Sequence, residues 1–318
     1  MALQKRNGSC QMDIAALIQK MIQLFLTVLV GFAAAKAGVL NEERNKVLSA
    51  LIVGVTNPIQ VLASVLTSDH ALSNLGVLQL SVIALCSYAF LIGSSVLIPK
   101  LLRVRQDEAG LYRFMYIFSN VGFIGYPLVS ALLGSGATFY LTVFVLFFQL
   151  VVWSYGVYLL GGGGKFCFSP EILKRPCIVA ALAAYVIYLT GLRLPVVIGR
   201  TAEMIGDMTG PLAMLVIGCS LAQMQLKSVF GRWQIYALAA IKLIFVPLLG
   251  YLVLRKLVTN ELMLGVSVVV LCMPVATNTT IISYQQHADD RLASAGVFVT
   301  TLLSVVTVPL MMHLLFGR

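Results

Sequence analysis

The chain has 318 residues, of which 59% are hydrophobic and 11% are charged, and its mean hydropathy is +0.95. A typical globular domain is roughly 45–50% apolar and about 25% charged, so these values exclude a water-soluble enzyme, a disulfide-rich secreted scaffold and a disordered chain. The formal net charge of +10 suits contact with anionic lipid headgroups better than binding of a nucleic acid. The composition therefore predicts an all-α, polytopic membrane protein.

Ten apolar segments are long enough to cross a bilayer, which takes about 20 residues in a helix. They span 14–38, 44–66, 74–99, 110–134, 137–160, 176–192, 197–224, 233–254, 262–286 and 292–315. The first segment exceeds the roughly 7–15 apolar residues of a signal peptide and lacks a small-residue cleavage site after it, so we expect it to be retained. The connections are short, which leaves no room for a separate soluble domain.

The distribution of basic residues predicts the orientation. One set of alternate loops holds 13 Lys and Arg residues and the other holds seven, with Lys20 and Lys242 inside spans. Because cytoplasmic loops carry the excess of Lys and Arg, both termini should lie outside and the central loop at 161–175 in the cytoplasm of a plasma membrane, most simply a bacterial inner membrane.

The two halves of the chain share similar breaks. Gly38 follows the first span and Gly191 the sixth, and Thr56-Asn57-Pro58 and Thr209-Gly210-Pro211 are separated by the same 153 positions. Each half contains five spans, an odd number, so the second half must enter the membrane in the opposite sense. We predict two inverted five-helix repeats, an arrangement common in alternating-access transporters. The repeats and their linker cover residues 1–161, 162–175 and 176–318.

The fourth and ninth spans both carry helix-breaking residues at membrane depth. The fourth reads Ser119-Asn120-Val121-Gly122-Phe123-Ile124-Gly125-Tyr126-Pro127, and the ninth reads Met273-Pro274-Val275-Ala276-Thr277-Asn278-Thr279-Thr280. Proline removes a backbone donor and glycine weakens a helix, so each helix should open here. Proline kinks and close packing of small residues are the structural alternative. Two such breaks in corresponding positions of two halves favour a substrate site.

The candidate substrate-binding residues lie in these two breaks. They are Asn120, Gly122, Gly125, Pro127, Pro274, Thr277, Asn278 and Thr279. We expect the side-chain amides and the positive N-terminal ends of the half-helices to hold a carboxylate.

Four further residues are candidates for ion coupling or for balancing substrate charge: Asp207, Lys242, Asn57 and Thr209. An acid inside the membrane tends to mark an ion or proton path, but Asp207 would be interfacial, like Glu203, if the seventh span began later. Lys242 could neutralise an anion or pair with Asp207, or it could extend its stem toward the basic face.

No residue pattern indicates catalysis. The six cysteines contain no CxxC pair, and the three histidines have no partner at metal-binding or catalytic spacing. We predict no enzyme activity, catalytic residue, metal site or cofactor. A membrane-embedded enzyme would need paired acids or a nucleophile with its base at membrane depth.

The sequence resembles the auxin efflux carrier family of the bile acid and auxin transporter grouping. The resemblance is carried by Ser119 through Leu128, by the Met273-Pro274-x-Ala276-x-Asn278 segment and by Ala293 through Pro309. It implies a scaffold group and a core group of helices, with the fourth and ninth helices crossing where they unwind. The short central segment resembles the prokaryotic branch, although Gln285-Gln286 stands where a glycine is expected after Tyr284.

The resemblance also implies export or exchange of small organic anions, such as auxin or malonate-like dicarboxylates. We therefore predict a secondary transporter that works by alternating access. The substrate, its direction, coupling to H⁺ or Na⁺ and assembly as a homodimer stay open. An anion channel or a non-transporting sensor on the same fold are the alternatives, and saturation with counterflow of labelled substrate would separate a carrier from a channel.

Overall fold

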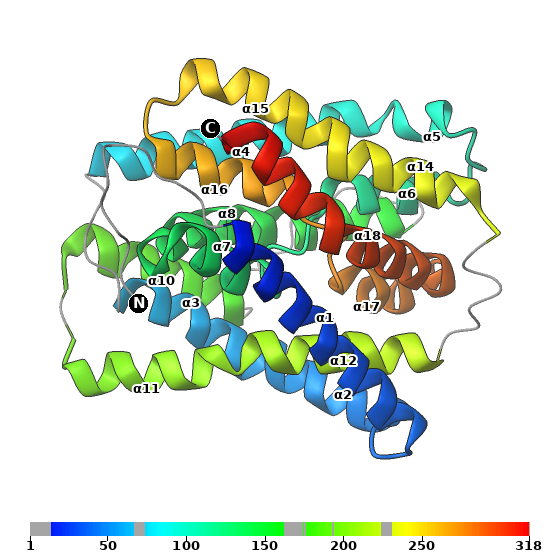
Figure 1. The fold of residues 1–318 in the computed structure, drawn as a ribbon, viewed down its shortest axis with the longest axis horizontal. Coiled ribbons are helices and arrows are strands. Elements are labelled where there is room, and N and C mark those ends of the chain that lie inside the picture. Colours follow the sequence, from blue (N-terminus) through cyan, green and yellow to red (C-terminus); the bar gives the residue numbers. More distant parts are fainter. Residues whose placement is uncertain are drawn as a thin grey trace.

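A computed structural model describes residues 14–66, 74–161, 174, 176–192, 194–223 and 231–317. All regular elements in these ranges are helices, and a single isolated β-bridge joins two loop segments. The predicted linker at 162–175 lies outside the described residues except for Lys174. Figure 1 shows the helices stacked side by side and largely antiparallel.

The helices of the first half are α1 Ile14–Lys36, α2 Glu42–Leu51, η1 Ile52–Thr56, α3 Asn57–Leu66, α4 Asn74–Ser95, α5 Ile98–Leu101, α6 Ala109–Ile117, α7 Gly125–Leu133, η2 Ser135–Ala137, α8 Thr138–Val151, η3 Val152–Gly156 and α9 Val157–Leu160. Those of the second half are α10 Pro176–Thr190, α11 Val196–Asp207, α12 Thr209–Gln223, α14 Trp233–Ala240, η5 Ile241–Phe245, α15 Val246–Leu257, α16 Glu261–Cys272, α17 Asn278–Gln285 and α18 Asp290–Phe316.

Six helical elements among the described residues are long and apolar enough to cross a membrane. They are Glu42–Leu66, Leu75–Ser95, Thr138–Leu160, Val196–Gln223, Trp233–Leu257 and Asp290–Phe316. The first and sixth predicted spans correspond to shorter apolar helices, and the fourth and ninth are each divided into two half-helices. The chain is thus a multi-pass membrane protein, while the full count of ten spans stays a prediction.

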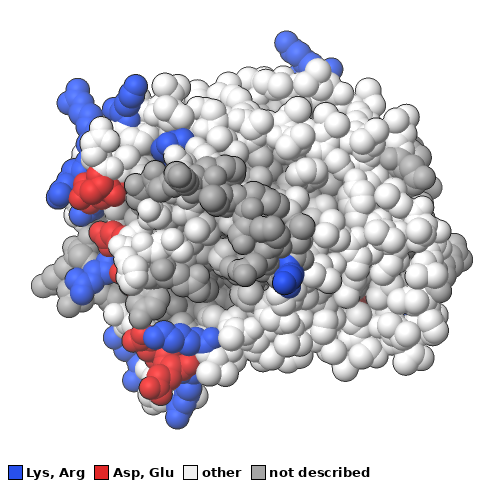
Figure 2. Space-filling view, turned by 180° about the vertical axis from the view of Figure 1, so that it is seen from behind, with Lys and Arg blue, Asp and Glu red and all other residues white. Residues whose placement is uncertain are grey.

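The molecular surface agrees with a membrane environment. Large apolar side chains such as Leu75, Val196, Val253 and Val306 are exposed on the outside of the helices. Figure 2 shows that most charged side chains on the visible face gather at one end of the molecule, which is the end where α5 and α17 lie in Figure 1. An uncharged band with a charged end is the pattern that a lipid bilayer favours.

Two of the long helices contain a π-helical turn just before a proline. The turn η1 precedes Pro58 and the turn η5 precedes Pro247. Proline lacks the N–H that would continue the regular ladder, so the helix widens by one residue before it. Such turns are frequent at functional sites, and Asn57 directly follows η1 while η5 contains Lys242.

The helices pack as two groups. The first group contains α1, α2, α3, α10, α11 and α12, and the second contains α4, α6 to α9 and α14 to α18. Within the first group, α1 and α12 meet backbone to backbone, because a Cβ atom at Gly218 would collide with the carbonyl of Val28. Figure 1 shows α11 and α12 along one edge of the molecule and α14 and α15 along the opposite edge.

A few polar contacts join the two groups. The Ser64 hydroxyl of α3 lies 2.6 Å from the Thr142 hydroxyl of α8, which in turn lies 2.9 Å from the hydroxyl of Tyr126 in α7. Ser81 of α4 is bonded at 2.6 Å to Tyr185 of α10. The rest of the contact between the groups, where α1 meets α7 and α18 and where α10 meets α8, is mostly apolar.

Candidate functional site

The two interrupted segments begin where the sequence changes from apolar to polar. Helix α6 ends at Ile117, and Phe118 turns into extended backbone with φ −92° and ψ 110°. Helix α16 ends at Cys272, and Met273 is likewise extended with φ −71° and ψ 146°. The half-helices α7 and α17 then start at Gly125 and Asn278. Each break frees backbone groups that cannot be exposed to lipid.

The two breaks satisfy each other's backbone groups. Ser119 and Val275 form an antiparallel bridge. The Asn120 N–H donates to the Pro274 carbonyl at 2.8 Å, and the Ala276 N–H donates to the Phe118 carbonyl at 3.0 Å. The structure therefore brings together segments that are more than 150 residues apart in the chain.

A side-chain bond connects the candidate residues across this contact. The Asn120 amide donates to the Thr277 hydroxyl at 2.8 Å, and both residues are buried. The Thr279 hydroxyl donates to the Ala276 carbonyl at 2.6 Å and so stabilises the first turn of α17. The Asn278 Oδ1 atom is buried and has no partner among the described residues. An unpaired buried acceptor costs free energy unless a ligand or water fills it.

The glycines and proline of the fourth span let neighbouring helices approach. A Cβ atom at Gly122 would lie 3.6 Å from the Asn57 amide nitrogen, and one at Gly210 would lie 3.6 Å from the Pro127 ring. At Gly125 the neighbours are the side chains of Leu141 and Met273. The break in the fourth span thus contacts α3 of the second span and α12 of the seventh span.

Asn57 and Thr209 lie at this approach with unfilled oxygens. Both residues are buried, and Asn57 Oδ1 and Thr209 Oγ1 have no hydrogen-bond partner within the part of the chain that the structure describes. The side-chain oxygens of Thr56 and Gln60, which lie close to Asn57 on its helix, are also buried without a hydrogen-bond partner among the described residues. Sequence reasoning missed Thr56 and Gln60, although three polar residues within five positions of an apolar helix were a usable signal.

Thr300 is a third residue that sequence reasoning did not place in the site. Its hydroxyl accepts a bond from the Val275 N–H at 3.1 Å and donates to the Gly296 carbonyl of its own helix at 2.7 Å. It therefore anchors the ninth-span break to α18. Its position in the Thr300-Thr301 pair of the carrier-like segment was the available hint.

Asp207 and Lys242 do not form an ion pair in the structure. Asp207 is the last residue of α11 and is exposed, inside an apolar element that begins at Val196. Lys242 is 2% exposed, so it does not extend to the surface, and its ammonium donates to the Tyr116 carbonyl at 2.7 Å. The structure thus places Lys242 beside the fourth-span break and Asp207 on an outer face of the first helix group.

The converging half-helices create a characteristic field. The N-termini of α7 and α17 and the C-termini of α6 and α16 all end at the two breaks. A helix end carries about half an elementary charge, positive at the N-terminus and negative at the C-terminus. The region therefore offers two positive and two negative ends to a bound ion.

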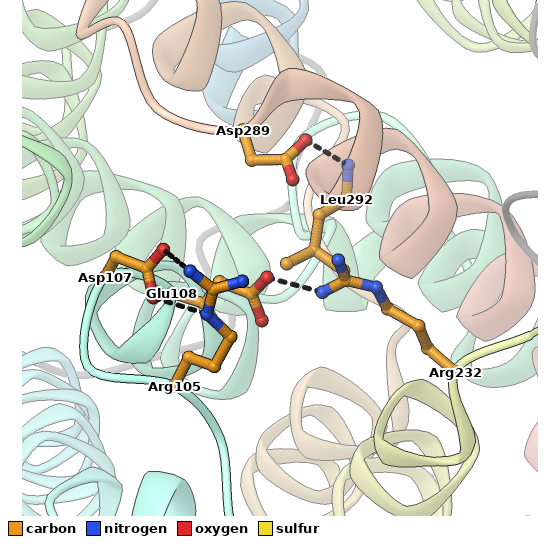
Figure 3. A network of polar contacts seen from close by, with 6 residues as sticks. All are labelled: Arg105, Asp107, Glu108, Arg232, Asp289 and Leu292. Atoms are coloured by element: carbon orange, nitrogen blue, oxygen red, sulfur yellow. Dashed lines mark hydrogen bonds and ion pairs between the residues drawn. The ribbon is translucent and has the colours of Figure 1, made fainter.

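The charged end of the molecule holds a separate polar network. The Arg232 guanidinium donates to the Glu108 carboxylate at 2.5 Å, and Arg105 pairs with Asp107 at 3.0 Å (Figure 3). Asp289 caps α18 by accepting from the Leu292 N–H. The hydrogen bond to Glu108 raises the pKa of Arg232 above its ordinary value. The Arg232–Glu108 pair joins the starts of α6 and α14, and the Asp289 carboxylate acts on Arg232 through its charge alone. No group of three His, Cys, Asp or Glu side chains among the described residues could hold a metal ion.

The structure has one small cavity next to the fourth-span break and a larger one at the charged end of the molecule. One, of about 30 Å³, is lined by apolar residues of α1 and α12 together with Ile124, Thr301 and Ser304. The other, of about 330 Å³, lies at the charged end and is lined by residues that include Glu108, Arg113, Tyr158 and Asp289. Neither is lined by Asn120 or Thr277, which are bonded to each other. Both residues are buried, so their contact is closed to solvent in this conformation.

A family model described as membrane transport protein matches the chain twice, over residues 16–171 and 166–312. The two matches together cover nearly the whole chain, one for each half. This finding agrees with an internal repeat.

Several curated proteins are similar along most of their length. An uncharacterized transporter of Methanocaldococcus jannaschii is 23% identical over 295 residues, covering 90% of this chain and 95% of its own. The uncharacterized transporter YfdV of Escherichia coli K12 is 22% identical over 310 residues, covering 93% and 96%. A Rhizobium meliloti protein named "Putative malonate transporter" is 24% identical over 218 residues, covering 65% and 68%.

Proposed function

The chain belongs to the membrane transport protein family, and from this premise we propose that it is a secondary transporter of small organic anions. The family assignment confirms the resemblance drawn from the sequence. The substrate class is supported by the name of the Rhizobium relative and by the polar, amide-lined contact between two broken helices. The single observation that carries the proposal is the Asn120–Thr277 bond beside the Ser119–Val275 bridge.

In this proposal the chain has ten spans in two inverted five-helix repeats, residues 1–161 and 176–318, joined by the linker 162–175. The double match of the family model and the paired breaks support it. The termini lie outside and the charged end that holds α5 and α17 faces the cytoplasm, as the excess of Lys and Arg at that end favours.

The substrate would bind where the fourth and ninth helices cross. Its carboxylate replaces the bond between Asn120 and Thr277 and accepts from the Asn120 amide, the Asn278 amide and backbone N–H groups at the starts of α7 and α17. Gly122, Gly125 and Pro127 on one side and Pro274 and Thr279 on the other shape the backbone so that these donors point inward.

Alternating access would arise from sliding of the two helix groups against each other. Their contact is mostly apolar, and its few hydrogen bonds can be exchanged for water. The substrate site lies on the second group, close to Asn57 and Thr209 of the first, so sliding would expose it to one face or the other.

Ion coupling is assigned to the first group in this proposal. Asp207 could carry a proton, and the unfilled oxygens of Asn57 and Thr209 could hold a cation or a substrate donor. Asp207→Asn should then uncouple uptake from a pH gradient, whereas uptake driven by Na⁺ or by the membrane potential alone should be unchanged in this variant.

The test is uptake of labelled malonate into proteoliposomes. Asn120→Ala and Asn278→Ala should each reduce uptake at least about tenfold, because a hydrogen bond to a charged group contributes roughly 1.5–3 kcal/mol. Asn45→Ala is the matched control, since it also removes an amide bond between helices, at 3.0 Å to Ser220, away from the site. Normal uptake by both site variants, or uptake without counterflow, would contradict the proposal.

A further inference from the structure

Lys242 of η5 is a buried lysine whose amine lies beside the end of the broken helix α6. It is among the largest fully buried side chains of the chain, with 2% exposure. It lies nine residues after Trp233, the first residue of its helical element, and so about 14 Å along it at 1.5 Å per residue. That depth places it near the middle of the membrane.

Lys242 bonds to a backbone carbonyl near the end of α6. If α6 continued, this carbonyl would accept a hydrogen bond from a backbone N–H of the next turn. The last four carbonyls of a helix have no partner within it. Tyr116 is the penultimate residue of α6, and its carbonyl accepts from the Lys242 ammonium at 2.7 Å. The Phe118 carbonyl, two residues on, is taken by the Ala276 N–H. Lys242 therefore caps α6 from a different helix.

No carboxylate among the described residues lies within 4 Å of the Lys242 ammonium. An ammonium has three donors, and here one protein acceptor is bonded to it. Burying a charge without a counter-charge is costly, and the negative end of α6 compensates only about half of it. The ammonium form of Lys242 therefore leaves part of its positive charge beside the break, where an anionic substrate would stabilise it.

The π-helical turn explains how the lysine reaches this place. In η5 the Val246 N–H donates to the Ile241 carbonyl, five residues back, and Pro247 follows without a donor. The wider turn shifts the face that residue 242 presents, relative to a regular α-helix. The π-helical turn η5 thus coincides with Lys242, the lysine of this membrane span that lies at mid-depth.

Because the two positive and two negative half-helix ends nearly cancel, Lys242 decides the sign of the field at the crossing. We propose that Lys242 is a positioning and charge-setting residue: it fixes the end of α6 next to Asn120 and gives the site its preference for anions, and for dianions over monoanions. This inference rests on the proposed function and names the charge class of its substrate.

The test compares substrates of similar shape and different charge. Malonate carries two negative charges at neutral pH and monomethyl malonate carries one. Lys242→Gln keeps a donor for the Tyr116 carbonyl but removes the charge, so KM for malonate should rise about tenfold or more, as expected for the loss of a charge–charge attraction in a medium with an effective dielectric constant of about 20. KM for monomethyl malonate should rise by a clearly smaller factor, and Lys242→Arg should keep the preference for malonate.

The control is Lys256→Met, which removes an exposed lysine from the end of α15 and should change neither KM. Equal increases of KM for both substrates in Lys242→Gln would show a purely structural role and overturn the inference. If the variant does not fold, the wild-type ratio of the two KM values decides: a ratio near one overturns it as well. Absence of uptake of either anion by the wild type would instead refute the proposed function, and this inference with it.

Discussion

The hydrogen bonds of Thr142 allow a quantitative prediction about the contact between the two helix groups. Thr142→Val keeps the shape of the side chain but removes the bonds to Ser64 and Tyr126, together with the 3.2 Å bond to the Thr138 carbonyl of its own helix. Ser64 keeps its bond to the Val61 carbonyl at 2.7 Å, so only the Tyr126 hydroxyl loses its partner. The free energy of unfolding should therefore fall by about 1–2 kcal/mol, because the bonds to Ser64 and Tyr126 contribute roughly 0.6–1 kcal/mol each.

The assay is thermal unfolding of the purified protein in detergent. Ser267→Ala is the matched control, because Ser267 is also a buried hydroxyl but, among the described residues, bonds only to the Met263 carbonyl of its own helix. Thr142→Val should lower Tm more than this control does. In a double-mutant cycle with Ser64→Ala, the two changes should be less than additive, since they remove the same bond. Full additivity, or a loss no larger than that of the control, would refute the reasoning.

Further predictions concern the same helix groups. A disulfide between cysteines that replace Ser64 and Thr142, whose hydroxyls are 2.6 Å apart, should stop malonate uptake until it is reduced, and continued uptake when cross-linked would exclude sliding. Gly218→Ala should destabilise the protein by about 1–3 kcal/mol through overpacking, as measured by Tm against Gly93→Ala, where nothing lies within 4 Å. Glu108→Gln should lower Tm more at low ionic strength than at high, because salt screens the lost ion pair; a salt-independent loss would show that packing dominates.

The breaks could be located from the sequence because their cause is local. Pro274 and the polar run after it, like Asn120 and the glycines before Pro127, disfavour a helix whatever surrounds them. The structure ends α6 at Ile117 and α16 at Cys272, directly before these motifs. The family, too, was recognisable from these residues, and the family model confirms it.

The partners of the candidate residues could not be located in the same way, because they depend on packing between distant segments. Nothing near Lys242 in the chain indicates that it bonds to Tyr116, 126 positions away. The sequence left open whether Lys242 pairs with Asp207, neutralises substrate or reaches the surface. Only the packing of η5 against α18 and α16 decides that it remains buried.

The first helix group has one feature that a purely structural role does not explain. The oxygens of Thr56, Asn57, Gln60 and Thr209 are buried without partners in the described part of the chain. Each would cost about 1–3 kcal/mol if it stayed unfilled, and apolar residues would pack the same helices without that cost. Asn57 lies against Gly122, next to the crossing, so under the proposed function these oxygens would gain a partner during the transport cycle, whereas Asn45 Oδ1 on α2, which also has no partner among the described residues, would not. The free-energy cost of these unpaired oxygens in the closed state would then be removed when substrate, cation or water binds to them.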